Sequence, residues 1–388
     1  MIKSFVAFTD EIDNPEAAIN ELSVQINDNG ELLSHTVGIV NCHYEFLESE
    51  TYKAIAEALP FPICGMTTPI CGGGPSKNGK GESGELFFTL LVLTSDDVSF
   101  EVGVSEEIAL GDNYEEAIKN VFSDNKKPGL LLVTAPTIEV IPGDDLMKIC
   151  EKFIPDVPIF GGFSIDDSPR YNENVYTLAK GEFYKNRVVF LKLFGNVHPR
   201  FYSASISRNK INKSFAVVTE SKGSEIISLN DRPVLEYLES IGLFETIIEN
   251  GIVANYALVI NEDDTGSDEY YARTMLRLSP QKTLICGGDI PQGAHLRIGQ
   301  FEKLDTIDSG RGACIEAFSK PADVVITMSS ISRATLLGAD IFHGINTVKN
   351  AANAPFIMIY AGGEICPVMN GKGFKNRFNN QSFNACVL

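Results

Sequence analysis

Four apolar segments of this chain end in glycine and are followed by polar side chains. Three of these ends contain Gly65 and Thr67, then Gly161, Gly162 and Ser164, then Gly362, Gly363 and Glu364. The fourth is ICGGD, residues 285–289. Glycine at a strand end lets a ligand or another backbone approach the main chain closely. A single Gly-Gly more often makes only a turn, but four such ends favour a binding site.

A run of amides, Asn379, Asn380 and Gln381, precedes Ser382 and the last apolar segment. Such runs commonly cap turns. Here they follow the glycine-rich end at Glu364 by one loop, so we expect them to face the same cleft. Amides donate to a carboxylate while Glu364 accepts from an ammonium group, a combination that suits a small zwitterion.

Arginines are informative in a chain with 32 basic and 51 acidic residues. Arg273 lies in YYARTMLRL, which alternates as a strand does, and Arg297 and Arg333 lie near other predicted strands. Each is more often a surface or ion-pair residue, yet one could clamp a carboxylate bidentately. We assign Arg273 to the ligand site.

An enzyme is the alternative function. Cys64, Cys366, Thr67 and Ser164 lie near the predicted cleft, but no histidine is close to them in sequence. We therefore assign no catalytic residue and favour a binding protein. The enzyme would use a cleft thiol or carboxylate, and a third alternative is an interaction scaffold without a ligand.

The cysteine and histidine patterns predict neither a metal nor a cofactor. No two of the eight cysteines form C-x-x-C, and the five histidines show no H-x-x-x-H spacing. Most cysteines have apolar neighbours, which predicts buried, reduced thiols. The glycine-rich stretch 71–84 resembles a phosphate loop in composition only, and we expect it to be a hairpin loop.

One structural pattern recurs along the chain. A strand, a helix, a strand that starts at proline and ends near glycine, a loop and two more strands occur after residue 37 and again after residue 130. A partial third copy runs from Val324 to the end, and its closing strand is Phe383–Leu388. The helix predicts a parallel crossover between the first two strands. The two strands after the loop are expected to pair antiparallel with each other.

These patterns predict an α/β protein of the mixed α+β kind, with mixed sheets flanked by helices. The 388 residues exceed what one core usually organises, which favours two domains. We expect the boundary in the polar stretch near Arg208, with domains at 1–208 and 209–388. In the second domain, residues 225–242 predict a strand, a tight turn at Asn230-Asp231 and a helix that begins near Pro233.

The net charge of −19 argues against nucleic acid and membrane surfaces as partners. No apolar stretch is long enough to cross a bilayer, and no signal core follows the first residues, which predicts a cytoplasmic protein.

The sequence resembles the FIST family, which has paired N- and C-terminal FIST domains, over nearly its whole length. The motifs that carry the resemblance are ICGMTT, IFGGFSIDD, SLNDRPVLEYL, YYARTMLRL, ICGGDIPQGAHLRIG and, most specifically, YAGGEICP followed by FNNQS. The family often has histidine where this chain has Asn379. The resemblance implies an intracellular sensory protein for small ligands such as amino acids, here acting through a separate signalling partner.

Overall fold

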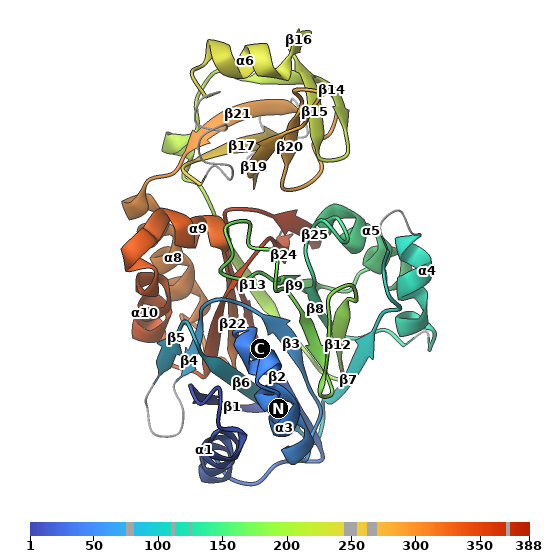
Figure 1. Ribbon diagram of the computed structural model, residues 1–388, viewed down its shortest axis with the longest axis vertical. Coiled ribbons are helices and arrows are strands. Elements are labelled where there is room, and N and C mark those ends of the chain that lie inside the picture. Colours follow the sequence, from blue (N-terminus) through green and yellow to red (C-terminus); the bar gives the residue numbers. More distant parts are fainter. Residues whose placement is uncertain (75–80, 110–112, 125, 244–253, 262–269, 370–372) are drawn as a thin grey trace.

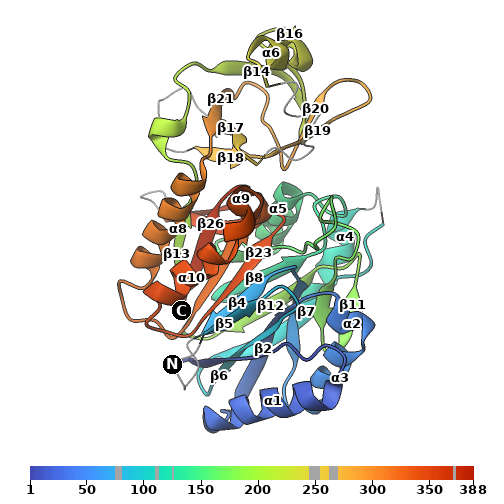
Figure 2. The same cartoon turned by 60° about the vertical axis from the view of Figure 1, so that its left-hand side comes forward.

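The protein consists of a large body and a smaller β domain that lies over one end of it (Figures 1 and 2). The structure, a computed structural model, describes residues 1–74, 81–109, 113–124, 126–243, 254–261, 270–369 and 373–388. The body holds three six-stranded sheets, and the β domain is built around a fourth sheet. No helix in the described ranges has the length and apolarity needed to span a membrane.

The three sheets of the body share one topology. Sheet A has the order β1 (Lys3–Thr9), β6 (Phe88–Ser95), β2 (His35–Cys42), β3 (Ile63–Thr67), β10 (Thr177–Ala179), β11 (Glu182–Tyr184). Sheet C has the order β7 (Ser99–Val104), β12 (Val189–Phe194), β8 (Leu130–Ala135), β9 (Ile159–Phe163), β24 (Glu364–Met369), β25 (Phe374–Asn379). Sheet B has the order β13 (Arg200–Ala204), β26 (Phe383–Val387), β22 (Val325–Ser330), β23 (Phe356–Ala361), β4 (Cys71–Gly74), β5 (Glu82–Gly84).

In each sheet the third and fourth strands are parallel and all other neighbours are antiparallel. The three predicted copies are therefore confirmed, as are the parallel crossovers through α3 (Thr51–Ala58), α5 (Gly143–Phe153) and α10 (Phe342–Ala351). The predicted mixed α/β class is confirmed as well.

The copies exchange their hairpins in a cycle. The hairpin β4–β5 of the first copy completes sheet B, β10–β11 of the second completes sheet A, and β24–β25 of the third completes sheet C. The chain ends also meet, because Asp323 accepts from the backbone N–H of Ile2 at 3.1 Å and donates its own N–H to the carbonyl of Leu388 at 2.6 Å. No copy is complete without another.

The predicted antiparallel pairing of the two strands after each loop is wrong. Strand β6 pairs with β1 and β2, whereas β7 pairs with β12 of the next copy. Likewise β12 stays in sheet C and β13 pairs with β26 in sheet B. Alternation identifies a strand with one buried face, but it does not identify the partner that covers its edge.

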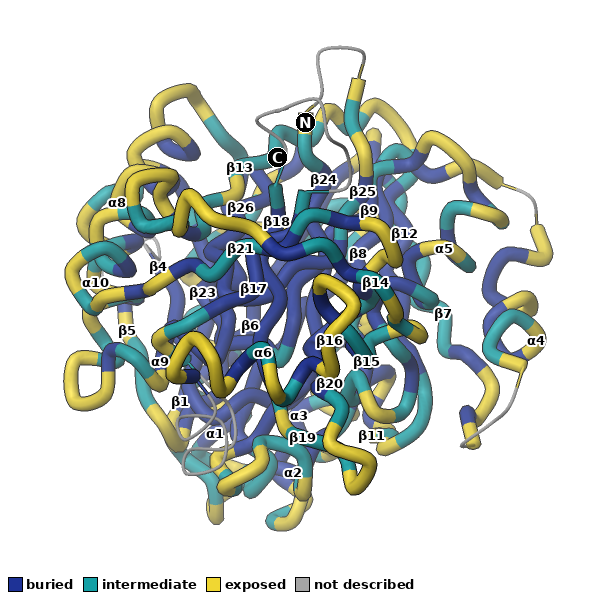
Figure 3. The backbone as a smooth tube through the Cα atoms, turned by 90° about the horizontal axis from the view of Figure 1, so that it is seen from above, coloured by how far each residue is buried: buried dark blue, intermediate teal, exposed yellow. Residues whose placement is uncertain are grey.

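The sheets face inward on one apolar core, and helices cover their outer faces. Residues of all three sheets, such as Val6, Leu132 and Ile326, share the central cluster. Helices α1 (Pro15–Asp28), α2 (Glu45–Glu48) and α3 cover sheet A, α4 (Tyr114–Ile118) and α5 cover sheet C, and α8 (Lys303–Ala317), α9 (Ile331–Leu337) and α10 cover sheet B. Seen from above, the buried strands gather in the middle and exposed backbone surrounds them (Figure 3).

Local sequence explains why these helices form. Helix α1 begins after Asn14, whose side chain accepts from the backbone N–H of Ala17 at 3.1 Å, and Pro15 fills the first turn. Its buried residues Ala18, Leu22 and Ile26 recur every four positions, so one face packs on sheet A.

The smaller β domain is inserted into the third copy, between β13 and α8. Its eight strands are β14 (Ala216–Lys222), β15 (Glu225–Leu229), β16 (Arg232–Pro233), β17 (Tyr256–Asn261), β18 (Tyr271–Arg273), β19 (Met275–Leu278), β20 (Leu284–Cys286) and β21 (His295–Gln300). As predicted, β15 is followed by a turn at Asn230 and Asp231, both with positive φ, and by helix α6 (Val234–Ser240) soon after Pro233. We call residues 216–300 the inserted domain. The domain division at residue 208 stays a prediction; the sheets draw strands from both sides of it.

The first prediction concerns the closing strand. Strand β26 lies between β13 and β22, as expected for an interior strand. Deleting Asn384–Leu388 removes the ladders to both neighbours and core side chains such as Cys386, so little soluble, folded protein should form. Expression yield and a thermal melt test this, and normal values for the truncated protein would contradict it.

The second prediction concerns the thiols. All eight cysteines are buried, and burial raises the pKa of Cys64 to about 12 and that of Cys366 well above its usual value. Since the thiolate is the reactive form, a thiol reagent should label the native protein slowly at every site and the urea-unfolded protein quickly. Rapid labelling of one cysteine in the native state would argue for a reactive thiol.

Candidate functional site

The glycine-rich ends of β9 and β24 lie side by side in sheet C. Glu364 pairs with Gly162 on one side and with Asn379 on the other. The backbone N–H of Phe163 donates to the carbonyl of Gly363 at 3.1 Å, and the N–H of Gly362 donates to the carbonyl of Phe163 at 2.9 Å. The structure thus brings these ends together with the turn that follows β25. We call this region the Glu364 site.

The glycines serve close packing at these ends. A Cβ on Gly65 would lie 1.7 Å from the carbonyl oxygen of Val40, and one on Gly161 would lie 1.9 Å from that of Val133. These two positions correspond in the first two copies, where adjacent parallel strands pack backbone to backbone. At Gly363 a Cβ would meet the ring of Phe378 at 2.6 Å. The strand-end glycines therefore have a packing reason that is independent of any ligand.

Glu364 is the centre of a buried polar chain. Its side chain is 0% exposed, and its Oε2 accepts from Ser382 Oγ at 2.8 Å. Ser382 Oγ in turn accepts from Asn384 Nδ2 at 2.7 Å. Within the described part of the chain, Oε1 of Glu364 and Oδ1 of Asn384 have no hydrogen-bond partner. A buried acceptor without a hydrogen-bond partner destabilises the folded state. The side chains of Glu364 and Asn384 can therefore each accept a further hydrogen bond.

Burial raises the pKa of Glu364 to about 8. The hydrogen bonds from Ser382, the positive field of Arg333 and the Ser330 hydroxyl lower it only partly. Burial therefore favours the protonated carboxyl group, and a cation placed beside Oε1 would favour its ionised form.

Asn380 and Gln381 face the inserted domain. Asn380 Oδ1 accepts from the backbone N–H of Thr274 at 3.3 Å, and its Nδ2 donates to the carbonyl of Gly287 at 3.4 Å. Gln381, whose φ is 52°, donates from Nε2 to the carbonyl of Tyr256 at 3.1 Å. The turn with Asn380 and Gln381, called the amide turn here, therefore connects the Glu364 site to the inserted domain.

Arg273 is engaged by the body rather than open to a ligand. Its Nη2 contacts both carboxylate oxygens of Asp144 on α5, at 3.0 and 3.2 Å, and its Nη1 donates to the carbonyl of Phe378 at 2.8 Å. Asp144 also accepts from the backbone N–H of Asp289 at 2.7 Å. This buried pair anchors the inserted domain on sheet C, and removing one partner would leave an uncompensated charge.

Thr67 and Ser164 contact each other instead of lining an open cleft. Their hydroxyl oxygens are 2.8 Å apart, and Ser164 also donates to the carbonyl of Thr67 at 2.9 Å. Thr67 Oγ1 accepts from the backbone N–H of Tyr176 at 2.9 Å. This saturated pair joins sheet A to sheet C.

Asn384 and Arg333 were absent from the predicted site. Asn384 lies in β26, where the apolar alternation of FNACVL places a polar residue on the core-facing side. That break in the pattern was the available signal. Arg333 is one of the three arginines named from the sequence, and the mixed polar and apolar residues beside it give no sign that it is buried. In the described residues no group of three or more His, Cys, Asp and Glu side chains is placed to hold a metal ion.

The third prediction follows from the pKa of Glu364. Between its ordinary value of 4.5 and about 8, the folded protein binds more protons than the unfolded chain. Stability should therefore fall as pH rises through this window, by up to about 1.4 kcal/mol per pH unit. Glu364→Gln, which stays neutral, should lose this component of the pH dependence.

Urea unfolding at pH 5, 6.5 and 8 measures this, with Glu57→Gln, at an exposed position of α3, as the control. Parallel pH profiles for the wild-type protein and Glu364→Gln would contradict the prediction.

Comparison with known proteins identifies the family of this chain. The model of the FIST N domain matches residues 36–232 and that of the FIST C domain matches residues 235–367. Two solved structures of cyanuric acid hydrolase, one of them from A. caulinodans, are 9% identical with a TM-score of 0.29, covering 100% of this chain and 98% and 99% of theirs. No curated protein matches significantly. FIST domains are sensory domains of signal transduction. Because the two models together span most of its length, the chain belongs to the FIST family.

Proposed function

We propose that this protein senses a small metabolite with an ammonium group, such as an amino acid, at the Glu364 site beneath the inserted domain. The observation that carries the proposal is the turn after β25. On one side Ser382 hydrogen-bonds Glu364, and on the other Asn380 and Gln381 hydrogen-bond the backbone of the inserted domain.

The chemistry of Glu364 supports a cationic ligand group. Its Oε1 is a buried acceptor without a partner in the described structure, and an ammonium group is a donor with three hydrogens. Binding would ionise Glu364 and release its proton. Affinity should therefore increase as pH rises toward about 8, because less work is then needed to remove that proton.

The amide turn supports a zwitterion. The hydrogen bonds that Asn380 Nδ2 and Gln381 Nε2 donate to Gly287 and Ala254 are long, at 3.4 and 3.3 Å. A ligand carboxylate is a stronger acceptor than a backbone carbonyl and would compete for these donors. Binding would then loosen contacts of the turn with the inserted domain and shift the population of domain arrangements.

The signal would be read by a separate signalling protein in the cytoplasm. The net charge of −19 supports a protein partner over nucleic acid or an anionic membrane.

The fourth prediction is that an amino acid or an amine raises the melting temperature in a thermal-shift screen that also includes small carboxylates and nucleotides. A ligand at a hundredfold excess over Kd stabilises the folded state by about 2.7 kcal/mol. Glu364→Gln should weaken the binding of a ligand at this site by about 2 kcal/mol or more, since the ammonium group loses a buried charged partner. Asn380→Ala should weaken ligand binding as well, and the control variant Glu57→Gln should bind the ligand as the wild-type protein does.

A ligand that is indifferent to both site variants, or a screen without any stabilising class, would contradict the proposal. Conversion of the ligand would instead favour the enzyme alternative. Glu364 gives that alternative its one support, because a carboxyl group with a pKa of about 8 is suited to proton transfer.

A further inference from the structure

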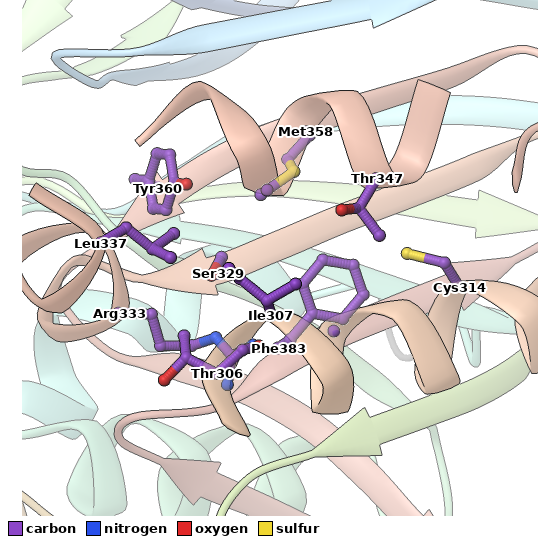
Figure 4. Close-up of a pocket in the computed structure, with 12 residues that line it drawn as sticks. Thr306, Ile307, Cys314, Ser329, Arg333, Leu337, Thr347, Met358, Tyr360 and Phe383 are labelled. Atoms are coloured by element: carbon purple, nitrogen blue, oxygen red, sulfur yellow. The ribbon is translucent and has the colours of Figure 1, made fainter. Parts of the chain in front are cut away.

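A small cavity that Glu364 does not line lies between the outer face of sheet B and helices α8, α9 and α10 (Figure 4). Its volume is about 20 Å³, enough for one water-sized particle. Its polar lining residues are Thr306, Ser329, Arg333 and Tyr360, and two glycines, Gly310 and Gly344, also line it. We call it the Arg333 cavity.

Arg333 brings a buried positive charge to this cavity. It is 4% exposed, and its guanidinium donates to the carbonyl of Thr306 at 2.6 Å and to Ser309 Oγ at 3.2 Å. Both partners are neutral, and Arg333 forms no ion pair within the described ranges. Burial lowers its pKa to about 10, so it stays charged at neutral pH.

In the part of the chain that the structure describes, no carboxylate lies within ion-pair distance of this guanidinium. Glu364 interacts electrostatically with Arg333 but forms no ion pair with it among the described residues, and burial raises the pKa of Glu364 to about 8. Burial also raises the pKa of Tyr360 well above its usual value, so the phenol is neutral. A buried cation without a counter-ion is strongly unfavourable.

Thr306 adds an unused hydrogen-bonding group. It is 2% exposed, it lines the cavity, and its Oγ1 has no partner in the described structure. The cavity therefore combines a guanidinium without an ion-pair partner and a hydroxyl without a hydrogen-bond partner among the described residues, and both groups are buried.

Two glycines keep the space open. A Cβ on Gly310 of α8 would lie 3.2 Å from Arg333 Nη2, and one on Gly344 of α10 would lie 2.8 Å from the Tyr360 hydroxyl. Glycine within a helix costs about 1 kcal/mol relative to alanine. A side chain at Gly310 would fill space beside the guanidinium, and one at Gly344 would fill space beside the Tyr360 hydroxyl.

We propose that the Arg333 cavity binds one small monovalent anion, either a halide ion or the carboxylate group of a small acid. The guanidinium supplies the charge and the Thr306 hydroxyl supplies a second donor. The volume admits a monatomic ion or the tip of a carboxylate and disfavours the bulkier sulfate and phosphate.

The fifth prediction compares two glycine variants of the same helix. Gly310→Ala places a methyl group against the guanidinium, whereas a Cβ on Gly312 meets nothing within 4 Å. Thermal melts of the 388-residue protein are titrated with bromide, formate and sulfate at constant ionic strength. Bromide or formate should raise the melting temperature of the wild-type protein and of Gly312→Ala, with sulfate weaker. The Gly310→Ala variant should bind bromide or formate at least about tenfold more weakly than the wild-type protein does.

Thr306→Val, which removes the hydroxyl at nearly constant size, should also weaken binding. A response to bromide alone identifies a free halide as the occupant, and a response to formate alone identifies a carboxylate. Crystals grown in bromide should show an anomalous peak beside Arg333 if the halide binds. Equal responses of Gly310→Ala and Gly312→Ala, or no response to either anion, would overturn the proposal.

Discussion

The cyclic exchange of hairpins is the constraint on which this structure depends. Each six-stranded sheet of the body is completed by two strands from another copy, so no copy can pair its own backbone groups alone. The three sheets therefore have to assemble together around one apolar core. The same exchange brings strand ends from distant parts of the chain into contact, and Gly162 meets Glu364 for this reason.

The assembly of the three sheets holds polar side chains in a buried environment. Glu364, Ser382 and Asn384 are joined by buried hydrogen bonds, and an acceptor at each end of this series has no partner among the described residues. Such a chain is unfavourable by itself and persists because the surrounding sheets fix it. Its position next to the turn at Asn380 also ties it to the inserted domain, which the Arg273–Asp144 pair anchors on the body. A single turn thus separates Glu364 from the inserted domain.

The two proposed sites are linked electrostatically. The positive field of Arg333 lowers the pKa of Glu364, although the two side chains form no ion pair within the described structure. An anion held beside Arg333 would offset that field and favour the protonated form of Glu364. The ammonium ligand requires the ionised form, so the two ligands would oppose each other.

The sequence by itself determined the three copies, the parallel crossovers, the buried thiols and the grouping of Gly162, Glu364 and Asn380. Each follows from local patterns: proline and glycine at strand ends, alternation, and spacing. Only the tertiary structure decided which strands pair, because alternation specifies the buried face of a strand and leaves its neighbour open. It likewise decided that Arg273 meets Asp144 while Arg333 is buried without a carboxylate partner in the described residues. The partner of a charge depends on contacts between distant segments, which no local pattern encodes.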